Sequence, residues 1–262
     1  MKTRNIILGA MAAIAMTSCC GNKTEADAKF ATDSVTFEQK DKSAEVTIYA
    51  DYPTAASEGL KTSIAEYISE TLGAKYMGSL ENGDSILNFY GKAKYEELAK
   101  EQKEMEAEMP FIADYKFNKA AETENYVTYT STYEEYMGGA HGSTVVQGAT
   151  FRKADGRKFG ADMLIGTEKE EFKALLKEGL KEYFEKPNMT DAQLKESLFL
   201  SEPYSVDNLP LPAFAPYLTD KGVTFTYQQY EIASYAAGLP TFTISFEKIK
   251  PYLSATVLKM LK

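Results

Sequence analysis

The sequence predicts an α+β fold, with an antiparallel sheet packed by helices in two closely associated halves. Segments that alternate polar and apolar residues, as half-buried strands do, are interspersed with segments whose apolar residues recur every three or four positions. The second pattern is typical of amphipathic helices. The strand-like segment at residues 125–136 is rich in threonine and tyrosine, which favours an antiparallel strand with one exposed face.

The N-terminal half is expected over residues 31–124. Its predicted elements are two strands of a hairpin, a helix, a turn, a charged helix and a strand, at residues 34–39, 45–51, 57–73, 82–84, 92–109 and 111–119. Ser57 can cap the first helix, whose apolar stripe includes Leu60, Ile64 and Ile68. Pro110 ends the second helix.

The C-terminal half is expected over residues 125–262. Its predicted elements are two strands, a turn, two helices, two more strands and a terminal helix after Pro251, at residues 125–136, 142–153, 154–157, 168–185, 190–198, 223–227 and 241–246. The helix at 168–185 is defined by an apolar stripe that includes Phe172, Leu176 and Leu180. The sequence shows no internal repeat.

The first twenty residues resemble a bacterial lipoprotein signal. Lys2 and Arg4 precede an apolar stretch of about eleven residues, 6–16, which is too short to span a membrane and suits a signal-peptide core. Ser18 and Cys19 follow, and Cys19 is the expected site of lipid attachment. An ordinary secretory signal followed by two incidental thiols is the alternative.

We therefore expect residues 1–18 to be a signal peptide and residues 19–30 to be a lipidated, polar tether. Each buried acyl methylene contributes about 0.8 kcal/mol, so two or three chains give lasting attachment to a membrane. No later stretch has the 18 apolar residues of a membrane-spanning helix. The predicted location is the bacterial cell envelope, at the outer membrane.

Composition excludes several functional classes. The 262 residues are 44% hydrophobic and 26% charged, as in ordinary globular proteins. Cys19 and Cys20 are the only cysteines and His141 is the only histidine, so a disulfide scaffold, a cysteine-based zinc site and a multi-histidine metal centre are excluded. We expect no cofactor.

The protein has a negative net charge. Loss of residues 1–18 would leave 27 basic and 38 acidic residues, for a formal net charge of −11. Such a charge argues against binding nucleic acid or anionic lipid, which require basic patches, and it suits a basic partner. Simple solubility explains the same charge.

Two stretches carry a resemblance to a known family. The first is Tyr136-Met137-Gly138-Gly139-Ala140-His141-Gly142, followed by Phe151, Asp155-Gly156-Arg157-Lys158 and Met163-Leu164. The second is Val223-Thr224-Phe225-Thr226-Tyr227-Gln228-Gln229-Tyr230-Glu231-Ile232-Ala233-Ser234-Tyr235-Ala236-Ala237-Gly238, followed by Phe242-Thr243-Ile244-Ser245-Phe246, Ile249 and Tyr252-Leu253. Together they resemble a domain of unknown function in the extracytoplasmic half of RsiV-type anti-sigma factors. The same domain occurs beside the catalytic domain of PdaC-type peptidoglycan deacetylases and in envelope lipoproteins of Bacteroides-like bacteria.

The resemblance implies an α+β binding module and not an enzyme. In RsiV-type proteins this region is a receptor for lysozyme. The present sequence has neither their transmembrane helix nor their sigma-binding segment, so we do not expect an anti-sigma factor. It also lacks a polysaccharide-deacetylase domain, so the deacetylase activity does not carry over.

The candidate ligand contacts are in the two motif stretches: Tyr136, Gly138, Gly139, His141, Gly142, Tyr230, Glu231, Tyr235 and Gly238. Alternatively, His141 bonds backbone in a tight turn in which Gly138, Gly139 and Gly142 adopt positive φ. The tyrosines also have a structural interpretation, as the cover of a partly buried sheet. These are Tyr126, Tyr129, Tyr133, Tyr136, Tyr227 and Tyr230.

The sequence contains no nucleophile motif or phosphate-binding loop. We expect a non-enzymatic, lipid-anchored envelope protein that binds a lysozyme-like basic protein or a peptidoglycan component. One alternative is an envelope hydrolase that acts on peptidoglycan or glycan through a carboxylate pair. Another is a structural lipoprotein of an envelope assembly.

Overall fold

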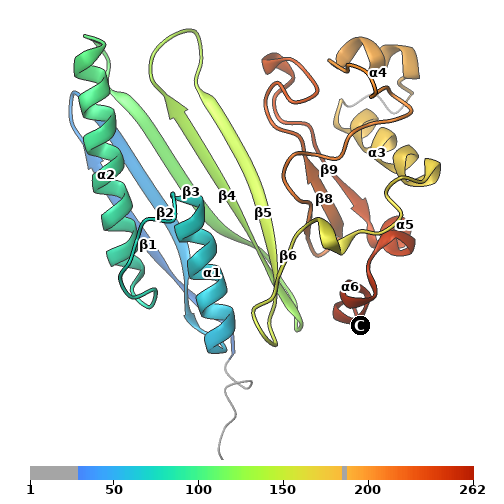
Figure 1. The fold of residues 1–262 in the computed structure, drawn as a ribbon, viewed down its shortest axis with the longest axis horizontal. Helices are drawn as coiled ribbons and strands as arrows, with labels where there is room; N and C mark the ends of the chain where they lie inside the picture. The colour runs from blue at the N-terminus through green and yellow to red at the C-terminus, as the bar shows by residue number, and fades with distance from the viewer. Residues whose placement is uncertain (1–28, 185–187) are drawn as a thin grey trace, which may run out of the picture.

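The computed structural model describes residues 29–184 and 188–262 (Figure 1). The predicted signal peptide, Cys19 and most of the predicted tether lie outside these residues. Two sheets of six and three strands, with helices packed on them, confirm the α+β class. No helix in the described ranges has both the length and the apolar character needed to cross a membrane.

The larger sheet has its six strands in sequence order. They are β1 (Ala31–Lys40), β2 (Ala44–Ala55), β3 (Phe111–Glu122), β4 (Tyr126–Tyr136), β5 (Ser143–Arg152) and β6 (Lys158–Phe159). Helices α1 (Glu58–Thr71) and α2 (Gly83–Glu104) cover one face of this sheet (Figure 1). Alternate residues of β2, including Val46, Ile48 and Ala50, are fully buried beneath them.

The prediction of a purely antiparallel sheet is wrong at one pair, because β2 and β3 are parallel. Between them the chain passes through α1 and then α2, and it returns to the end of the sheet where β2 begins. The second helix spans Gly83–Glu104 and not the predicted 92–109, so it ends several residues before Pro110. Asn82-Gly83-Asp84, predicted as a turn, is the start of α2, and the Asn82 side chain accepts a hydrogen bond from the Ser85 N–H at 2.9 Å.

The smaller sheet is antiparallel and lies in the C-terminal part of the chain. It contains β7 (Tyr217–Leu218), β8 (Gly222–Thr226) and β9 (Thr241–Ser245). Its helices are α3 (Glu170–Tyr183), α4 (Asp191–Ser197), α5 (Phe246–Ile249) and α6 (Ala255–Met260), with 3₁₀ turns at Ala161–Met163, Tyr235–Ala237 and Lys250–Tyr252. Gly179 lets α3 approach β9, because a Cβ at this position would overlap the ring of Phe242.

The predicted division at residue 124 does not coincide with a boundary in the structure. Strands β3 and β4 pair across it, and the six-stranded sheet continues to Phe159. Two hydrophobic cores are nevertheless present, and β4 serves both. Val127 and Tyr129 belong to the first core, whereas Tyr126 belongs to the second.

The two halves are joined tightly along β5. Gly148 leaves room for the ring of Tyr217, because a Cβ at residue 148 would overlap that ring. The Thr150 hydroxyl accepts a hydrogen bond from the Leu218 N–H at 2.9 Å. Phe30, placed in the tether by the sequence, is instead buried in the first core. The folded body therefore begins at the predicted end of the tether.

Candidate functional site

The second motif stretch closes an open edge of the larger sheet. Strand β6 pairs with β5 only at the C-terminal end of β5. Farther up this edge, Gln228 accepts a hydrogen bond from the Val146 N–H at 3.0 Å and donates one to the Val146 carbonyl at 2.8 Å. Gln229 accepts from the Thr144 N–H at 2.9 Å. Two side-chain amides thus satisfy edge groups that a seventh strand would otherwise pair.

This docking brings the two motif stretches together. The imidazole of His141, in the β4–β5 loop, stacks on the ring of Tyr235 with centroids 3.7 Å apart and 17° between planes. Its Nδ1 lies 2.9 Å from the Gly142 carbonyl oxygen. A carbonyl oxygen only accepts, so Nδ1 donates to it, and Nε2 lies 3.3 Å from the Tyr230 hydroxyl oxygen. We call His141, Tyr230 and Tyr235 the aromatic cluster.

Tyr230 is held in an unusual backbone conformation. Its φ is 62°, in the left-handed region that residues other than glycine and asparagine seldom adopt. Its side chain is also exposed, at 59% relative accessibility. Strain of this kind costs about 1–3 kcal/mol, and burial of the ring does not compensate for it here. Such strain is concentrated at functional sites.

Glu231 supports the cluster from inside. One carboxylate oxygen accepts from the Gln228 N–H and the other from the Ala213 N–H, both at 2.7 Å. Both oxygens therefore bind the protein's own backbone, which fixes the turn that carries Tyr230. These two bonds give Glu231 a positioning role, and its contact with ligand stays a prediction.

The glycines of the first loop act in two ways. Gly138 and Gly139 have φ values of 89° and 85°, as the turn interpretation predicted. Gly142 does not have positive φ, contrary to expectation, and is needed for close packing. A Cβ there would lie 2.6 Å from the Glu135 carbonyl oxygen. The Tyr136 hydroxyl donates to the Gly139 carbonyl at 3.1 Å and so stabilises the loop.

Gly238 ends the second stretch with a φ of 73°. A Cβ at this position would lie 3.0 Å from the hydroxyl oxygen of Tyr183. That hydroxyl donates to the Ala237 carbonyl at 2.7 Å. Gly238 is therefore a structural residue that permits α3 to anchor the 3₁₀ turn carrying Tyr235.

Most of the tyrosines considered as sheet cover are indeed structural. Tyr126, Tyr129 and Tyr227 are buried, and each donates its hydroxyl to a backbone carbonyl. Tyr133 is half-buried and stacks on Tyr115 with centroids 4.2 Å apart. Tyr230 differs from these because its ring is largely exposed.

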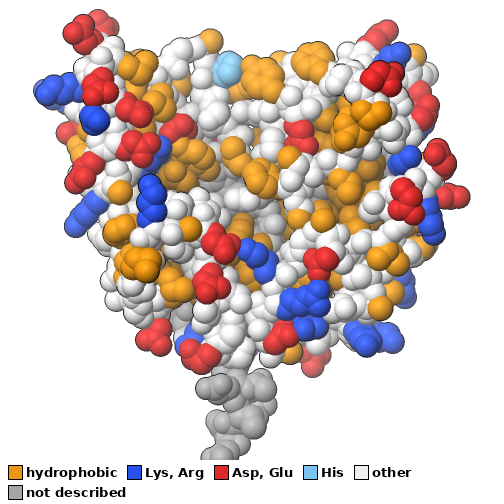
Figure 2. All heavy atoms as spheres, viewed as in Figure 1, with side chains coloured by type: hydrophobic (Ala, Val, Ile, Leu, Met, Phe, Trp, Pro, Cys, Tyr) orange, Lys and Arg blue, Asp and Glu red, His pale blue; other side chains and the backbone are white. Residues whose placement is uncertain are grey.

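An exposed apolar surface lies next to the second motif stretch. The Phe199 N–H donates to the Ile232 carbonyl at 2.7 Å, and Ala213 is bonded to Glu231, so the loop 199–214 lies against the second motif stretch. Four large apolar side chains of this loop are exposed: Phe199, Tyr204, Leu211 and Phe214. In Figure 2 the single histidine lies at one end of the molecule beside hydrophobic side chains. Exposed aromatic surface of this kind is typical of binding sites.

The aromatic cluster lies at the end of the sheet opposite to the start of β1. Tyr136 pairs with Ile112, which pairs with Glu45, which pairs with Lys40 at the end of β1. Ala31 is thus at the far end of the strands. The ten residues of β1 span about 30 Å at about 3.3 Å each. A chain tethered through its N-terminus would present the cluster away from its attachment point.

The sequence predicted three of the side chains that form this site, His141, Tyr230 and Tyr235, and the structure brings them together. The sequence did not predict a role for Gln228 and Gln229, although they are adjacent amides within the second motif stretch. Within residues 29–184 and 188–262, no group of three or more His, Cys, Asp and Glu side chains is placed to hold a metal ion.

Two family models match the chain. The model described as "Deacetylase PdaC" matches residues 39–144, and the one described as "Protein of unknown function (DUF3298)" matches residues 163–247. His141 falls in the first matched segment, and Tyr230 and Tyr235 fall in the second. The aromatic cluster is therefore one of the contacts between the two matched segments. A comparison with curated proteins finds no match.

Two solved structures have the same fold. A DUF3298-family member from Bacteroides fragilis NCTC 9343 has a TM-score of 0.73 and 22% identity, covering 92% of this chain and 99% of the other. A DUF3298-family protein from Pseudomonas aeruginosa PAO1 has a TM-score of 0.59 and 16% identity, covering 89% and 98%. The resemblance inferred from the sequence motifs is thereby confirmed: this chain combines a segment that matches PdaC with a segment that matches DUF3298, in the fold of DUF3298-family proteins.

Proposed function

We propose that this protein is a lipid-anchored binding protein of the bacterial cell envelope, without catalytic activity, and that the aromatic cluster is its ligand-contact surface. The single observation that carries this proposal is the convergence of both motif stretches on exposed rings, one of them on a strained backbone. Tyrosine rings supply large contact areas with few rotatable bonds, which suits them to interfaces.

The partner we propose is a basic protein of lysozyme type. Exposed carboxylates lie at the same end of the sheet as the cluster: Glu106 and Glu108 precede β3, and Glu134 lies two residues before Tyr136. Together with the net charge of −11 expected after signal removal, they would attract a cationic partner and speed its association. A peptidoglycan fragment is the other ligand to be tested.

Calorimetric titration tests the binding proposal. The chain from Gly21 onward is titrated with lysozyme and with muropeptides at low and at physiological salt. We expect saturable binding to lysozyme that weakens with salt. Tyr230→Ala should weaken it at least tenfold, while Phe89→Ala, which removes an exposed aromatic side chain of α2, should have little effect. Absence of lysozyme binding at low salt would refute this partner.

The membrane anchor requires its own test. We propose attachment through Cys19, which the lipoprotein-like leader supports. Cells that express the full chain are fed a fatty-acid analogue. The wild type should become labelled and Cys19→Ala should not, with Cys20→Ala as the matched control that keeps its label. Labelling of Cys19→Ala would contradict the assignment.

An envelope hydrolase is the second candidate, because one pocket has two carboxylates on its wall. This pocket, of about 390 Å³, is lined by Glu124 and Asp220 among others and lies at the start of β4. Most glycosidases use a pair of carboxyl groups for catalysis. Incubation with purified peptidoglycan, followed by analysis of released fragments, tests it. Release that Glu124→Gln abolishes would favour the hydrolase over our proposal.

A further inference from the structure

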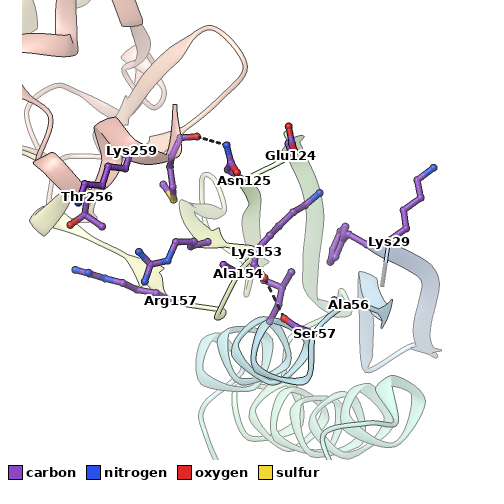
Figure 3. Close-up of a pocket in the computed structure, with 14 residues that line it drawn as sticks. Lys29, Ala56, Ser57, Glu124, Asn125, Lys153, Ala154, Arg157, Thr256 and Lys259 are labelled. Atoms are coloured by element: carbon purple, nitrogen blue, oxygen red, sulfur yellow. Dashed lines mark hydrogen bonds between the residues drawn. The ribbon is translucent and has the colours of Figure 1, made fainter. Parts of the chain in front are cut away.

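A larger pocket, of about 810 Å³, lies at the end of the sheet opposite to the aromatic cluster. Its walls come from the start of β1, the start of α1, the β3–β4 turn, the β5–β6 turn and α6. Figure 3 shows Lys259 and Thr256 on one side, Lys29 on the other and Lys153 between them. The volume is within the range of ligand-binding pockets, about 300–1,000 Å³.

The pocket is cationic in an otherwise acidic protein. Five basic side chains and one carboxylate line it: Lys29, Arg152, Lys153, Arg157, Lys259 and Glu124. Arg152 and Arg157 pair with Asp155 and Asp162 just outside the lining, and Lys153 pairs with Glu122. Lys29 and Lys259 have no carboxylate within 4.0 Å among the described residues. Against these two ammonium groups the lining has one carboxylate, that of Glu124, so the pocket keeps a net positive charge.

The remaining wall offers hydrogen-bond donors and apolar surface together. Ser57, the N-cap residue of the 14-residue helix α1, is on the wall, so the N-terminal end of this helix lies at the pocket. The Ser57 hydroxyl donates to the Lys153 carbonyl at 3.3 Å, and Thr256 adds a second hydroxyl to the wall. Phe30, Leu60 and Met260 provide apolar area beside these groups. Cations, hydroxyls and apolar side chains in one pocket match an amphiphilic phosphate.

We propose that this pocket binds the phosphate of a membrane phospholipid headgroup. The choice of a lipid rests on the proposed Cys19 anchor. Nine residues lie between Cys19 and Lys29, and the ten Cα–Cα steps can extend at most about 35 Å, so the pocket would stay close to the membrane surface. The acidic net charge argued against binding anionic lipid, but the fold concentrates cations at the one end where such a surface would lie.

The test uses the unacylated chain that begins at Gly21, so it does not depend on the anchor. Both hydrophobic cores begin at or after Phe30 and are retained in this chain. The fraction of this chain that sediments with neutral phosphatidylcholine vesicles is compared with the fraction that sediments with vesicles containing phosphatidylglycerol. In parallel, binding of inorganic phosphate is measured by calorimetry. The test variant is Lys29→Glu/Lys259→Glu. The control is Lys92→Glu/Lys195→Glu, which reverses two exposed lysines elsewhere and gives the same net charge.

We expect binding to the anionic vesicles. The affinity should be lower by at least about 25-fold in the pocket variant, because loss of each lysine charge near the surface costs about fivefold and the introduced carboxylates add repulsion. The control variant should retain most of the affinity. Binding of inorganic phosphate but not of vesicles, lost in the pocket variant, would overturn the lipid source and support a site for free phosphate. Equal losses in both variants, or no binding to either probe, would overturn the pocket proposal. Neither result would bear on the Cys19 labelling experiment.

Discussion

His141 stacks face to face on Tyr235, with ring centroids 3.7 Å apart, and this contact joins the segment that matches PdaC to the segment that matches DUF3298. Each ring is carried by a loop that the rest of the fold fixes. The Gln228 and Gln229 amides hold one loop against β5, and the Tyr136 hydroxyl braces the other. An exposed surface with this much internal support is preorganised for binding.

The histidine is a natural probe of this contact, since the chain has only one. We expect the His141 Hε1 proton resonance to lie upfield of its position in the unfolded chain, because the Tyr235 ring covers the imidazole face. Tyr235→Ala should move the resonance towards the unfolded position. Tyr204→Ala should leave it in place. A wild-type resonance at the unfolded position would show that the rings do not stack in solution.

Strain at Tyr230 predicts an unusual effect on stability. Tyr230→Gly removes a side chain from a residue with φ of 62°, so the free energy of unfolding should stay constant or rise by up to about 1 kcal/mol. Tyr204→Gly, at ordinary φ, should lower it by about 0.5–1 kcal/mol. Urea unfolding followed by circular dichroism measures both. A loss above 1 kcal/mol in Tyr230→Gly would mean that its ring stabilises the fold.

The close approach of β5 to Tyr217 makes Gly148 sensitive to any added volume. Gly148→Ala should lower the free energy of unfolding by about 1–3 kcal/mol, because its Cβ would overlap the tyrosine ring. The same substitution should cost less when Tyr217 is already leucine, and a double-mutant cycle of urea unfolding measures that coupling. Additive effects would show that the two residues do not pack together in solution.

Buried tyrosines predict instability at high pH. Burial raises the pKa of Tyr67 to about 12, and it also raises the pKa of Tyr129 and Tyr227. In the unfolded chain these hydroxyls ionise near pH 10. Their contribution to stability is therefore complete below pH 10 and declines as the pH rises through 10 to 12.

Tyrosinate absorbance and circular dichroism are followed together from pH 9 to 12.5, and ionisation of the buried tyrosines should coincide with one cooperative loss of the circular dichroism signal. Tyr67→Phe loses the hydrogen bond to Ser131, at 3.0 Å, and about 1 kcal/mol at neutral pH. Its stability should then fall less steeply above pH 10 than that of the wild type. Identical slopes for the two proteins would contradict the assigned shift.

The sequence predicts the repeating elements of this fold better than their connections. The helix at 168–185 and the short helix at 190–198 correspond to α3 and α4, because stripes of apolar residues are set by local periodicity. The parallel pairing of β2 with β3 requires the connection between them, α1 and α2, to bring the chain back to the end of the sheet where β2 begins. The sequence therefore has to predict the bounds of α2 correctly. Asn82-Gly83-Asp84 has turn chemistry and N-cap chemistry alike, and only the packing of α2 on the sheet decides between them.

For the candidate site, sequence patterns identified the residues but not their roles. The neighbouring sequence does not show that both carboxylate oxygens of Glu231 accept from backbone N–H groups. It also does not show that the Gln228 side chain bonds to Val146, on a sheet edge 82 residues earlier in the chain. The cationic pocket could not be predicted from the sequence, because Lys29 and Lys259 come from opposite ends of the chain. Contacts between distant segments create each of these features.

The measurement that tests the central claim most directly is a titration of the chain from Gly21 with lysozyme at low salt, followed through the His141 Hε1 resonance. If the aromatic cluster is the ligand-contact surface, the resonance should shift or broaden with saturation, and Tyr230→Ala should require at least tenfold more lysozyme for the same change. Saturable binding detected by calorimetry with the His141 resonance unmoved would place the binding surface elsewhere and contradict this account.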